Sequence, residues 1–288
     1  MRWRRRRERL RAVLAGDSCV HPASVFDAGS ARIASSLGFE AAMLAGSVAS
    51  LAVLGAPDLI LLTLSELADL ALRIGRAAEL PLIVDADHGY GNALNVARTI
   101  EELENAGVAL VTIEDTALPR RFNQTQPSLL PLDEGVGKVR AALAAREDPA
   151  LIVAGRTTVS TAGVAQAIAR GEAYRAAGVD AIFFAGLRTS AELEAIAACV
   201  PPPIMLGGTP KGLGDRAMLA RHGVRMALQP HLSFAAAMQA VFTTLKALRD
   251  GTPPEAIAGV APPALLREIA REDDYRAAAA AFLASPPA

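Results

Sequence analysis

Cysteine, long apolar runs and net charge are all scarce in this chain of 288 residues, and each absence excludes a class of protein. The two cysteines, Cys19 and Cys199, are too few and too far apart in sequence to indicate a disulfide framework or a zinc site. No apolar run is both long enough and free enough of charge to span a membrane. The net charge of -1 argues against a nucleic-acid partner held by a general electrostatic field. We therefore expect a cytoplasmic protein that binds neither nucleic acid nor a membrane.

The N-terminal segment is strongly basic, with six arginines among its first ten residues. Such a run is found in export signals and in nucleic-acid-binding tails. The apolar part that follows, residues 10–16, is interrupted by Arg11 and is too short for the core of a signal peptide. We expect residues 1–20 to form an amphipathic lead-in helix with a solvated basic face.

Short apolar runs alternate with longer amphipathic stretches from residue 22 onward. Hydrophobic residues make up 52% of the chain, so a substantial core can be buried. Helical periodicity marks residues 66–74 and 164–177, and glycine follows several such stretches as a stop signal. The apolar runs predict eight buried strands, at residues 23–26, 41–44, 82–84, 110–113, 152–154, 181–184, 204–206 and 225–228.

Eight strands that alternate with helices predict a parallel sheet. At this length the closed (β/α)₈ TIM-type barrel is favoured, and a doubly wound open sheet is the alternative. No G-x-G-x-x-G motif follows the first strand, which argues against the open sheet. We expect one α/β domain over residues 1–288, with the barrel at 21–250 and a C-terminal helical extension at 251–288.

A barrel places its functional residues at the C-terminal ends of its strands. Polar residues follow most of the predicted strands at that end. They are Asp27, Gly46-Ser47, Asp85 and Asp87, Glu114-Asp115, Arg156 just past the fifth strand, and Gln229-Pro230-His231 after the eighth. This clustering predicts an active site at that end of the barrel.

Asp85 and Asp87 end the third predicted strand, two residues apart. Residues two apart in a strand point to the same side, so the two carboxylates could share one ligand. Their mutual repulsion would be relieved by a hard cation such as Mg²⁺. The alternative is that Asp87 only caps the next helix. Glu114, on the neighbouring strand, favours the metal, with one carboxylate bound directly and the others through water.

Arg156 would face these carboxylates across the barrel mouth. Its forked guanidinium group is suited to bind a substrate carboxylate or an enolate-type oxygen. The alternative is a structural ion pair with Glu114. Backbone N–H groups at Gly46-Ser47 could hold a substrate carboxylate, although Ser47 fits a helix N-cap equally well.

Two histidines complete the candidate set. His231 could bind substrate or move a proton near neutral pH, or it could be a packing residue. His88 could help to shape the same mouth, or it could simply pair with the aspartates beside it. The loop at residues 118–129 fits a mobile lid and an ordinary surface loop equally well.

Several motifs resemble the isocitrate lyase/phosphoenolpyruvate mutase superfamily over residues 20–250. The motifs are Ser24-Val25-Phe26-Asp27-Ala28-Gly29-Ser30-Ala31, Ala45-Gly46-Ser47-Val48-Ala49, Asp58 before Leu62-Thr63-Leu64-Ser65-Glu66, Asp85-Ala86-Asp87-His88-Gly89-Tyr90-Gly91-Asn92, Thr112-Ile113-Glu114-Asp115 and Glu134-Gly135-Val136-Gly137-Lys138. The resemblance implies a (β/α)₈ barrel, a Mg²⁺ site in which Mn²⁺ is also possible, and an α-keto carboxylate substrate. It also implies a homotetramer, a dimer of dimers, in which the eighth helix (residues 233–248 here) is exchanged between subunits.

The loop after the fourth strand narrows the resemblance. Lyases of isocitrate and methylisocitrate carry a Lys-Lys-Cys-Gly-His signature there, whereas this chain reads Leu118-Pro119-Arg120-Arg121-Phe122-Asn123-Gln124, without cysteine. The sequence is most similar to the bacterial oxaloacetate decarboxylase branch. That branch implies substrate binding by Ser47, Arg156 and His231, and a metal site at Asp85 supported by Asp87 and Glu114 through water. The implied reaction is Mg²⁺-dependent decarboxylation of oxaloacetate, or a close β-keto acid, to pyruvate and CO₂ through a metal-stabilised enolate.

Two segments depart from the family pattern. Thr157-Thr158 follow Arg156 where relatives carry threonine and then Asn or Asp, and Gly207-Gly208-Thr209-Pro210 follow the seventh strand where bulkier or amide side chains are usual. Both departures concern the substrate pocket more than the metal. The alternatives are therefore another C–C or C–P bond lyase or hydrolase of the superfamily, acting on a different 2-oxo or 2-hydroxy acid, and a non-catalytic carboxylate-binding barrel.

Overall fold

The computed structural model describes residues 2–208 and 214–283 and divides them into two compact units. The first unit ends at His231 and the second begins at Leu232. The second unit contains α11 (Leu232–Arg249), η1 (Pro254–Ala256), α12 (Pro263–Ala270) and α13 (Glu272–Phe282). The helix expected at residues 233–248 is therefore present, and it groups with the C-terminal helices. The division of the chain into a barrel at 21–250 and an extension from 251 stays a prediction.

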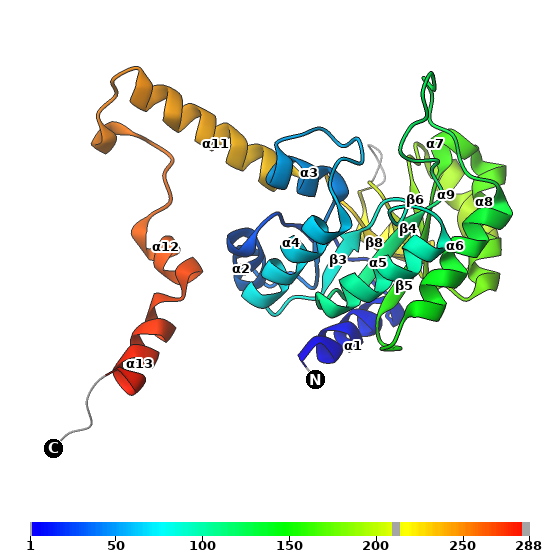
Figure 1. The fold of residues 1–288 in the computed structure, drawn as a ribbon, viewed down its shortest axis with the longest axis horizontal. Helices are drawn as coiled ribbons and strands as arrows, with labels where there is room; N and C mark the ends of the chain where they lie inside the picture. The colour runs from blue at the N-terminus through cyan, green and yellow to red at the C-terminus, as the bar shows by residue number, and fades with distance from the viewer. Residues whose placement is uncertain (1, 209–213, 284–288) are drawn as a thin grey trace. The chain divides into compact units, whose positions relative to one another are not determined.

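Eight strands form one parallel sheet in sequential order (Figure 1). They are β1 (Ala23–Ser24), β2 (Ala42–Leu44), β3 (Leu82–Asp85), β4 (Leu110–Glu114), β5 (Ile152–Thr158), β6 (Ala181–Ala185), β7 (Ile204–Leu206) and β8 (Val224–Ala227). Seven of the predicted strands agree to within two residues at each end. The fifth was predicted too short, because β5 continues through Thr158. Arg156 therefore lies inside β5 rather than just past it, which corrects its predicted position.

A parallel bridge between Val20 and Met226 closes the ring of strands. The N–H of Val20 donates to the carbonyl of Arg225 (3.0 Å), and the N–H of Ala227 donates to the carbonyl of Val20 (3.0 Å). These bonds join the segment before β1 to β8, so neither edge of the sheet is left open. The predicted TIM-type barrel is confirmed, and the alternative of an open doubly wound sheet is wrong.

Helices follow the strands around the sheet (Figure 1). Those of the first unit, after the N-terminal helix, are α2 (Ala28–Ser36), α3 (Gly46–Leu54), α4 (Leu64–Ala77), α5 (Ala93–Asn105), α6 (Leu132–Ala145), α7 (Val159–Ala162), α8 (Val164–Ala177), α9 (Ser190–Cys199) and α10 (Arg216–Arg221). The predicted helix at 164–177 matches α8, and Gly178 ends it with φ = 103°. Within the described part of the chain, no helix has the length and apolar character needed to cross a membrane.

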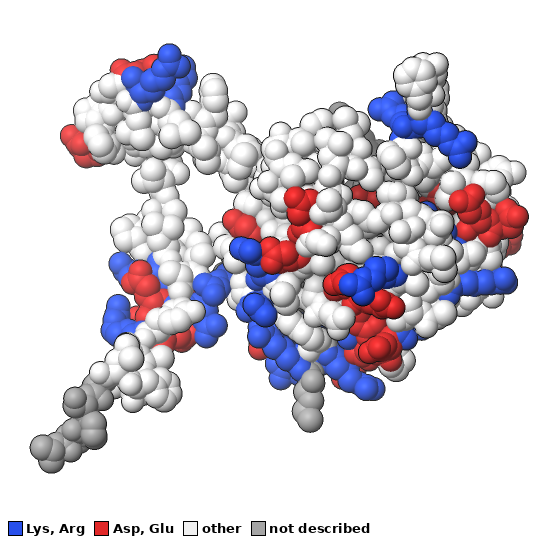
Figure 2. All heavy atoms as spheres, in the orientation of Figure 1, with Lys and Arg blue, Asp and Glu red and all other residues white. Residues whose placement is uncertain are grey.

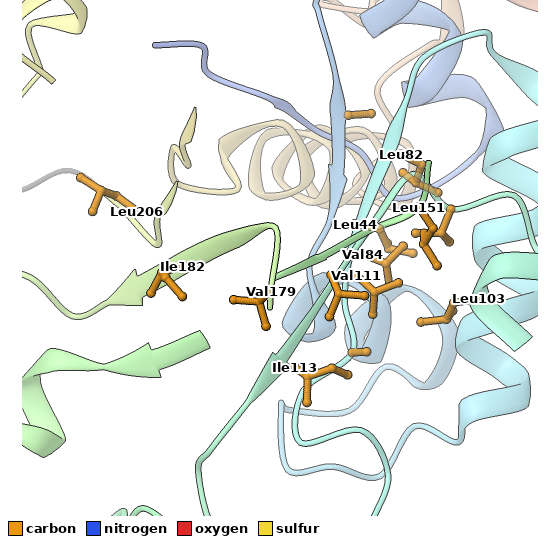
Figure 3. Close-up of a cluster of buried hydrophobic side chains, with 14 of the residues drawn as sticks. Leu44, Leu82, Val84, Leu103, Val111, Ile113, Leu151, Val179, Ile182 and Leu206 are labelled. Atoms are coloured by element: carbon orange, nitrogen blue, oxygen red, sulfur yellow. The ribbon is translucent and has the colours of Figure 1, made fainter. Parts of the chain in front are cut away.

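Side chains alternate along each strand between the helical layer and the barrel interior. In β3, Leu82 and Val84 belong to the large apolar cluster between the sheet and the helices, part of which Figure 3 shows. Ile83 and Asp85 are also buried but lie outside that cluster. The strands thus read as near-continuous apolar runs, as expected for a sheet that is covered on both faces.

The N-terminal helix α1 (Arg2–Ala15) presents the predicted basic face to solvent through Arg4, Arg5 and Arg9, but two of its arginines are buried instead. Arg7 is only 4% exposed and donates to the carbonyls of Glu104 (2.5 Å) and Val108 (2.9 Å), and it pairs with Asp148 (2.8 Å). Arg6 is also buried and donates to the carbonyl of Gly75 (2.6 Å). Figure 2 shows basic side chains gathered over the end of the first unit where α1 lies. The guanidinium fork satisfies several acceptors at once, so α1 is bound to the barrel through its arginines.

We expect Arg7→Met to lower the free energy of unfolding by about 3 kcal/mol, because it leaves Asp148 and two buried carbonyls without their donor. Arg4→Met is the matched control on the same helix. Arg4 is exposed and, among the residues that the structure describes, pairs with Glu8 alone, so its loss should cost roughly 0.5 kcal/mol or less. Urea unfolding of the three proteins measures both values. Equal losses for the two variants would contradict the buried role of Arg7.

Candidate active site

One cavity of about 550 Å³ opens at the C-terminal ends of the barrel strands. It is lined by residues from or after most of the strands, including Met43, Ser47, Asp58, Asp85, Asp87, Glu114, Arg156, Phe183, Gly207 and His231. The prediction that functional side chains gather at this end of the barrel is therefore confirmed. Seven of the nine candidate site residues line the cavity, and the other two, Gly46 and His88, do not.

Arg156 lines the cavity from within β5. The strand register places Glu114, Arg156 and Phe183 in one row across β4, β5 and β6. Arg156 forms an ion pair with Asp85, its Nε lies 3.0 Å from Oε2 of Glu114, and its guanidinium lies 5.4 Å from the centre of the Phe183 ring. Burial alone would lower the pKa of Arg156, but Asp85 and Glu114 raise it above its ordinary value. The structural ion pair with Glu114 is thus present, and the same guanidinium also faces the cavity.

Asp85 is fixed by three donors. Thr112 donates from Oγ1 (2.9 Å), the backbone N–H of Asp87 donates to the same carboxylate oxygen (3.3 Å), and Arg156 donates to the other oxygen. Thr112 is the register partner of Asp85 on β4. Side chains from β4 (Thr112) and β5 (Arg156) therefore hold this carboxylate in place.

Asp87 reaches the cavity by a different route from the one its spacing suggested. β3 ends at Asp85, and Asp87 has φ = 49°, in the left-handed region that aspartate tolerates better than most residues. The carbonyl of Asp87 accepts the N–H of Glu114 (2.8 Å), which ties this turn to β4. Asp87 thus lines the cavity as predicted, but a turn after β3 places it there rather than the alternation of side chains along a strand. The helix-cap alternative is also wrong, because Asn92 caps α5.

Four carboxylates crowd this end of the barrel, and their charges oppose one another. Burial and the neighbouring Asp85, Asp58 and Glu114 raise the pKa of Asp87 to about 9, despite the opposing effect of Arg156. Burial and Asp85 raise the pKa of Asp58, and burial is also the main reason why the pKa of Glu114 is raised. The carboxylates of the cavity outnumber its two arginines, Arg120 and Arg156, so the cavity favours a bound cation.

The carboxylate set fits a hard divalent cation of the magnesium type. No group of three or more His, Cys, Asp or Glu side chains within residues 2–208 and 214–283 is placed to hold a metal ion by itself. Mg²⁺ does not require such a group, because it keeps several waters and is commonly held by one or two carboxylates together with substrate oxygens. Asp85 and Asp87, with Glu114 behind them, provide the oxygen donors for that mode of binding.

The start of α3 faces the same cavity through Ser47. The N-cap of α3 is Ala45, which makes no side-chain cap, so the N-cap alternative for Ser47 is wrong. Helix N-termini with unsatisfied N–H groups bind anions, and Ser47 adds a hydroxyl. Gly46 does not line the cavity, but a Cβ at Gly46 would lie 2.7 Å from Oδ1 of Asp87. Glycine is needed there because the carboxylate occupies the space of a side chain.

His231 follows β8 and is half-buried. Its Nδ1 lies 2.8 Å from Oγ of Ser24, a residue of β1. This contact leaves Nε2 as the ring nitrogen for a ligand. Burial lowers the pKa of His231, against the opposing effect of Asp85. The lowered pKa favours the neutral imidazole, which serves as a hydrogen-bonding group. Ser24 was part of a noted motif, but sequence gave no sign of its contact with His231.

Three residues with sequence signals lie away from the cavity. His88 is buried in a separate, smaller cavity beside Lys138, and burial followed by the charge of Lys138 lowers its pKa to about 4. Asp27 forms a capping box at the start of α2. Asp115 is buried and binds Arg170 (2.9 Å) and the hydroxyl of Tyr174 (2.6 Å). Asp27 and Asp115 have structural roles.

Sequence reasoning missed a set of cavity residues on the segments after β4 and β5. They are Thr116, Arg120, Ser160 and Thr161, and they are joined by Thr158, which was noted only as a departure from a family pattern. Thr157 is fully buried and does not line the cavity. α7 has only four residues, too few to show a periodicity that would have revealed its exposed face. Gly207 lines the cavity, whereas Thr209-Pro210 lie outside the described residues.

Comparison with known proteins gives consistent matches over nearly the whole chain. A family model described as phosphoenolpyruvate phosphomutase matches residues 10–249. An oxaloacetate decarboxylase from Bradyrhizobium diazoefficiens is 53% identical over 284 residues, covering 98% of this chain and 99% of that protein. The solved structure of an oxaloacetate acetylhydrolase in complex with the inhibitor 3,3-difluorooxalacetate has a TM-score of 0.84 at 28% identity, covering 95% and 96% of the two chains. A phosphonopyruvate hydrolase complex with oxalate and Mg²⁺ has a TM-score of 0.85 at 28% identity, covering 97% and 99%.

The raised pKa of Asp87 predicts a pH-dependent stability when divalent metal is removed by EDTA. With a pKa of about 9, Asp87 keeps its proton in the folded protein, whereas the unfolded chain releases it near the ordinary value of 3.8. Folding therefore binds a proton between these values, and wild-type stability falls as the pH rises through this window. Asp87→Asn removes that loss, so its Tm should exceed that of wild type by an amount that grows from pH 5 to pH 8.

Asp133→Asn is the matched control, because Asp133 is an exposed carboxylate at the start of α6. Its Tm should differ from that of wild type by the same amount at both pH values. A constant difference for Asp87→Asn as well would contradict the raised pKa.

Proposed function

The chain belongs to the phosphoenolpyruvate phosphomutase family, and we propose that it is a lyase that decarboxylates oxaloacetate, or a close β-keto acid, to pyruvate and carbon dioxide. The observation that carries this proposal is the arrangement within one cavity of three groups: the carboxylates Asp85, Asp87 and Glu114, the guanidinium of Arg156, and the start of α3 at Ser47. A cation-binding surface and two anion-binding groups thus face one another, as a substrate with carboxylate and keto oxygens requires.

Each of these residues has a role that follows from its charge or its hydrogen-bonding groups. Ser47 and the N–H groups at the start of α3 hold a substrate carboxylate. Arg156, which its two acidic partners keep fully protonated, faces the negative charge that develops as the C3–C4 bond breaks and CO₂ leaves. Neutral His231, held at Nδ1 by Ser24, offers Nε2 to a substrate oxygen. The pyruvate enolate then takes up one proton at C3 to give pyruvate.

We assign the metal position to Asp85, with Asp87 and Glu114 acting through water and Asp58 supporting them, and we assign the metal as Mg²⁺ or Mn²⁺. When bound, such an ion draws electron density from the keto oxygen and so lowers the barrier to loss of CO₂. The support for this assignment is the excess of carboxylates over positive charge in the cavity.

The direct test is oxaloacetate decarboxylation by the purified protein with Mg²⁺ and with EDTA, after subtraction of spontaneous decay. We expect metal-dependent turnover in wild type and a fall to background in Asp85→Ala, because that change removes the proposed ligand and a partner of Arg156. Ser47→Ala leaves those groups in place and should lower kcat/KM by roughly tenfold to a hundredfold. Turnover by Asp85→Ala equal to that of wild type would exclude the assigned site.

Product analysis in the same assay distinguishes decarboxylation from hydrolytic cleavage, the reaction named for the structurally similar acetylhydrolase. Decarboxylation yields pyruvate and CO₂. Addition of water across the C2–C3 bond yields oxalate and acetate instead. Formation of oxalate without pyruvate would replace the proposed reaction with the hydrolytic one.

Arg120 is a second arginine in the lining of this cavity, and we propose that it binds the substrate. It lies in the loop after β4, and within the described residues it has no ion pair or hydrogen bond from its side chain, whereas Arg156 is engaged by two carboxylates. A dicarboxylate such as oxaloacetate brings a second negative charge that Arg120 can neutralise.

We expect Arg120→Met to raise KM for oxaloacetate by roughly tenfold or more and to change kcat by less, because a charge-assisted contact to the bound substrate is lost. Arg120→Lys should recover part of the affinity. Arg76→Met, at an exposed position on α4, is the control and should leave both constants unchanged. An unchanged KM for Arg120→Met would remove Arg120 from the substrate site.

We also propose a homotetramer, a dimer of dimers, in which α11 is exchanged between subunits. The support is that α11 exposes several large apolar side chains, among them Leu232, Val241, Phe242 and Leu245, which a partner subunit would bury. Sedimentation of the purified protein measures the mass of the assembly and so tests whether it is a tetramer. We place the protein in the cytoplasm on the ground that neither Cys19 nor Cys199 is in a disulfide.

A further inference from the structure

A second, smaller cavity of about 180 Å³ lies beside the active site. Thr116, Ala117 and Leu118 line both cavities, so one short segment separates them. The remaining lining residues are His88, Gly91, Asn92, Pro119, Arg121, Leu130, Glu134 and Lys138. The reaction proposed above uses none of these remaining residues.

Lys138 is a buried basic residue in the lining of this smaller cavity. The chain has only three lysines among its 29 basic residues, and this one is 2% exposed on the inner face of α6. Among residues 2–208 and 214–283 it has no ion pair and no hydrogen bond. The charges of Glu134, Glu114 and Asp115 act on Lys138 without a direct ion pair. A buried ammonium with no direct partner is costly, so this position favours a bound negative charge.

His88 supplies a second unsatisfied polar group. Its side chain is 5% exposed, and its Nδ1 is buried without a hydrogen-bond partner in the described structure. Buried polar atoms are nearly always hydrogen-bonded, and the exceptions commonly mark a missing ligand, ion or water. Arg121 adds a further positive charge to the lining, and Glu134 is its one carboxylate. The lining itself thus contains three nitrogen-bearing side chains and one acidic side chain.

We propose that this cavity binds a small planar oxyanion of the carboxylate or bicarbonate class, held between the ammonium of Lys138 and the imidazole of His88. Arg121 contributes a further positive charge near the bound anion. A water molecule takes up about 30 Å³ in the liquid, so 180 Å³ accommodates a three- or four-atom anion with a few waters. The site stands independently of the reaction assigned to the main cavity.

Binding there reaches the active site through the shared segment. Thr116 forms an antiparallel bridge with Leu129, and the N–H of Ala117 donates to the carbonyl of Ser128 (2.9 Å), so the segment is the base of the loop that carries Arg120. An anion on Lys138 orders the back of that segment, while a substrate contacts its front. Two ligands share this chemistry: bicarbonate, into which released CO₂ hydrates, and a short carboxylate.

Thermal unfolding in EDTA tests the site without assembling the metal-dependent active site. Sodium bicarbonate and sodium acetate are compared with sodium chloride at equal ionic strength and pH, for wild type, Lys138→Met and Arg140→Met. Arg140 is an exposed residue of the same helix and serves as the matched control. We expect at least one oxyanion to raise the Tm of wild type and Arg140→Met by roughly 2–4 °C at ten times its Kd, relative to chloride, and to leave Lys138→Met unchanged.

The two oxyanions separate the sources: a shift with bicarbonate alone assigns the site to it, and a shift with acetate assigns it to carboxylates in general. Glu134→Gln should bind the active oxyanion several-fold more tightly, because it removes the competing acid from the lining. Equal shifts in wild type and Lys138→Met would overturn the proposal, as would no shift with either oxyanion. Loss of decarboxylase activity would leave these expectations untouched, since the assay requires neither metal nor turnover.

Discussion

The repulsion among buried carboxylates at one end of the barrel is the constraint on which the rest of the site depends. Asp85, Asp87, Glu114 and Asp58 converge because parallel strands end at a common edge, and burial there makes each negative charge costly. Arg156 offsets part of this cost from inside β5. The remainder keeps the cavity selective for cations, and with them for the carboxylate and keto oxygens that bind metals.

The fold could be predicted from sequence because its signals are periodic and local. Eight apolar runs gave the strands, and the rule that barrels place function at strand ends located most of the site. Failures came where a long-range contact decides the outcome. Arg6 and Arg7 of α1 are buried, unlike their exposed neighbours, and nothing in the run Met1–Leu10 reveals the carbonyls of Gly75 and Val108 that bind them.

Inside the site, sequence spacing predicted which residues gather but not how they do so. Asp87 has the spacing of a strand residue, yet it sits in a left-handed turn held by the N–H of Glu114. His88 is adjacent to Asp87 in sequence but faces another cavity, since the same turn directs neighbouring side chains to different sides. Ser24 contacts His231 across the closure of the barrel, a contact between the first and last strand regions that no local pattern encodes.

The bridge between Val20 and Met226 also has a consequence for how the chain assembles during synthesis. Strands β1 to β7 can pair with their sequence neighbours as they emerge, whereas the segment at Val20 must wait until β8 has been made. Contacts of such high sequence separation form late and slowly. The cavity that needs His231 and Ser24 together is therefore completed in the last step of folding, and a nascent chain lacks the finished site.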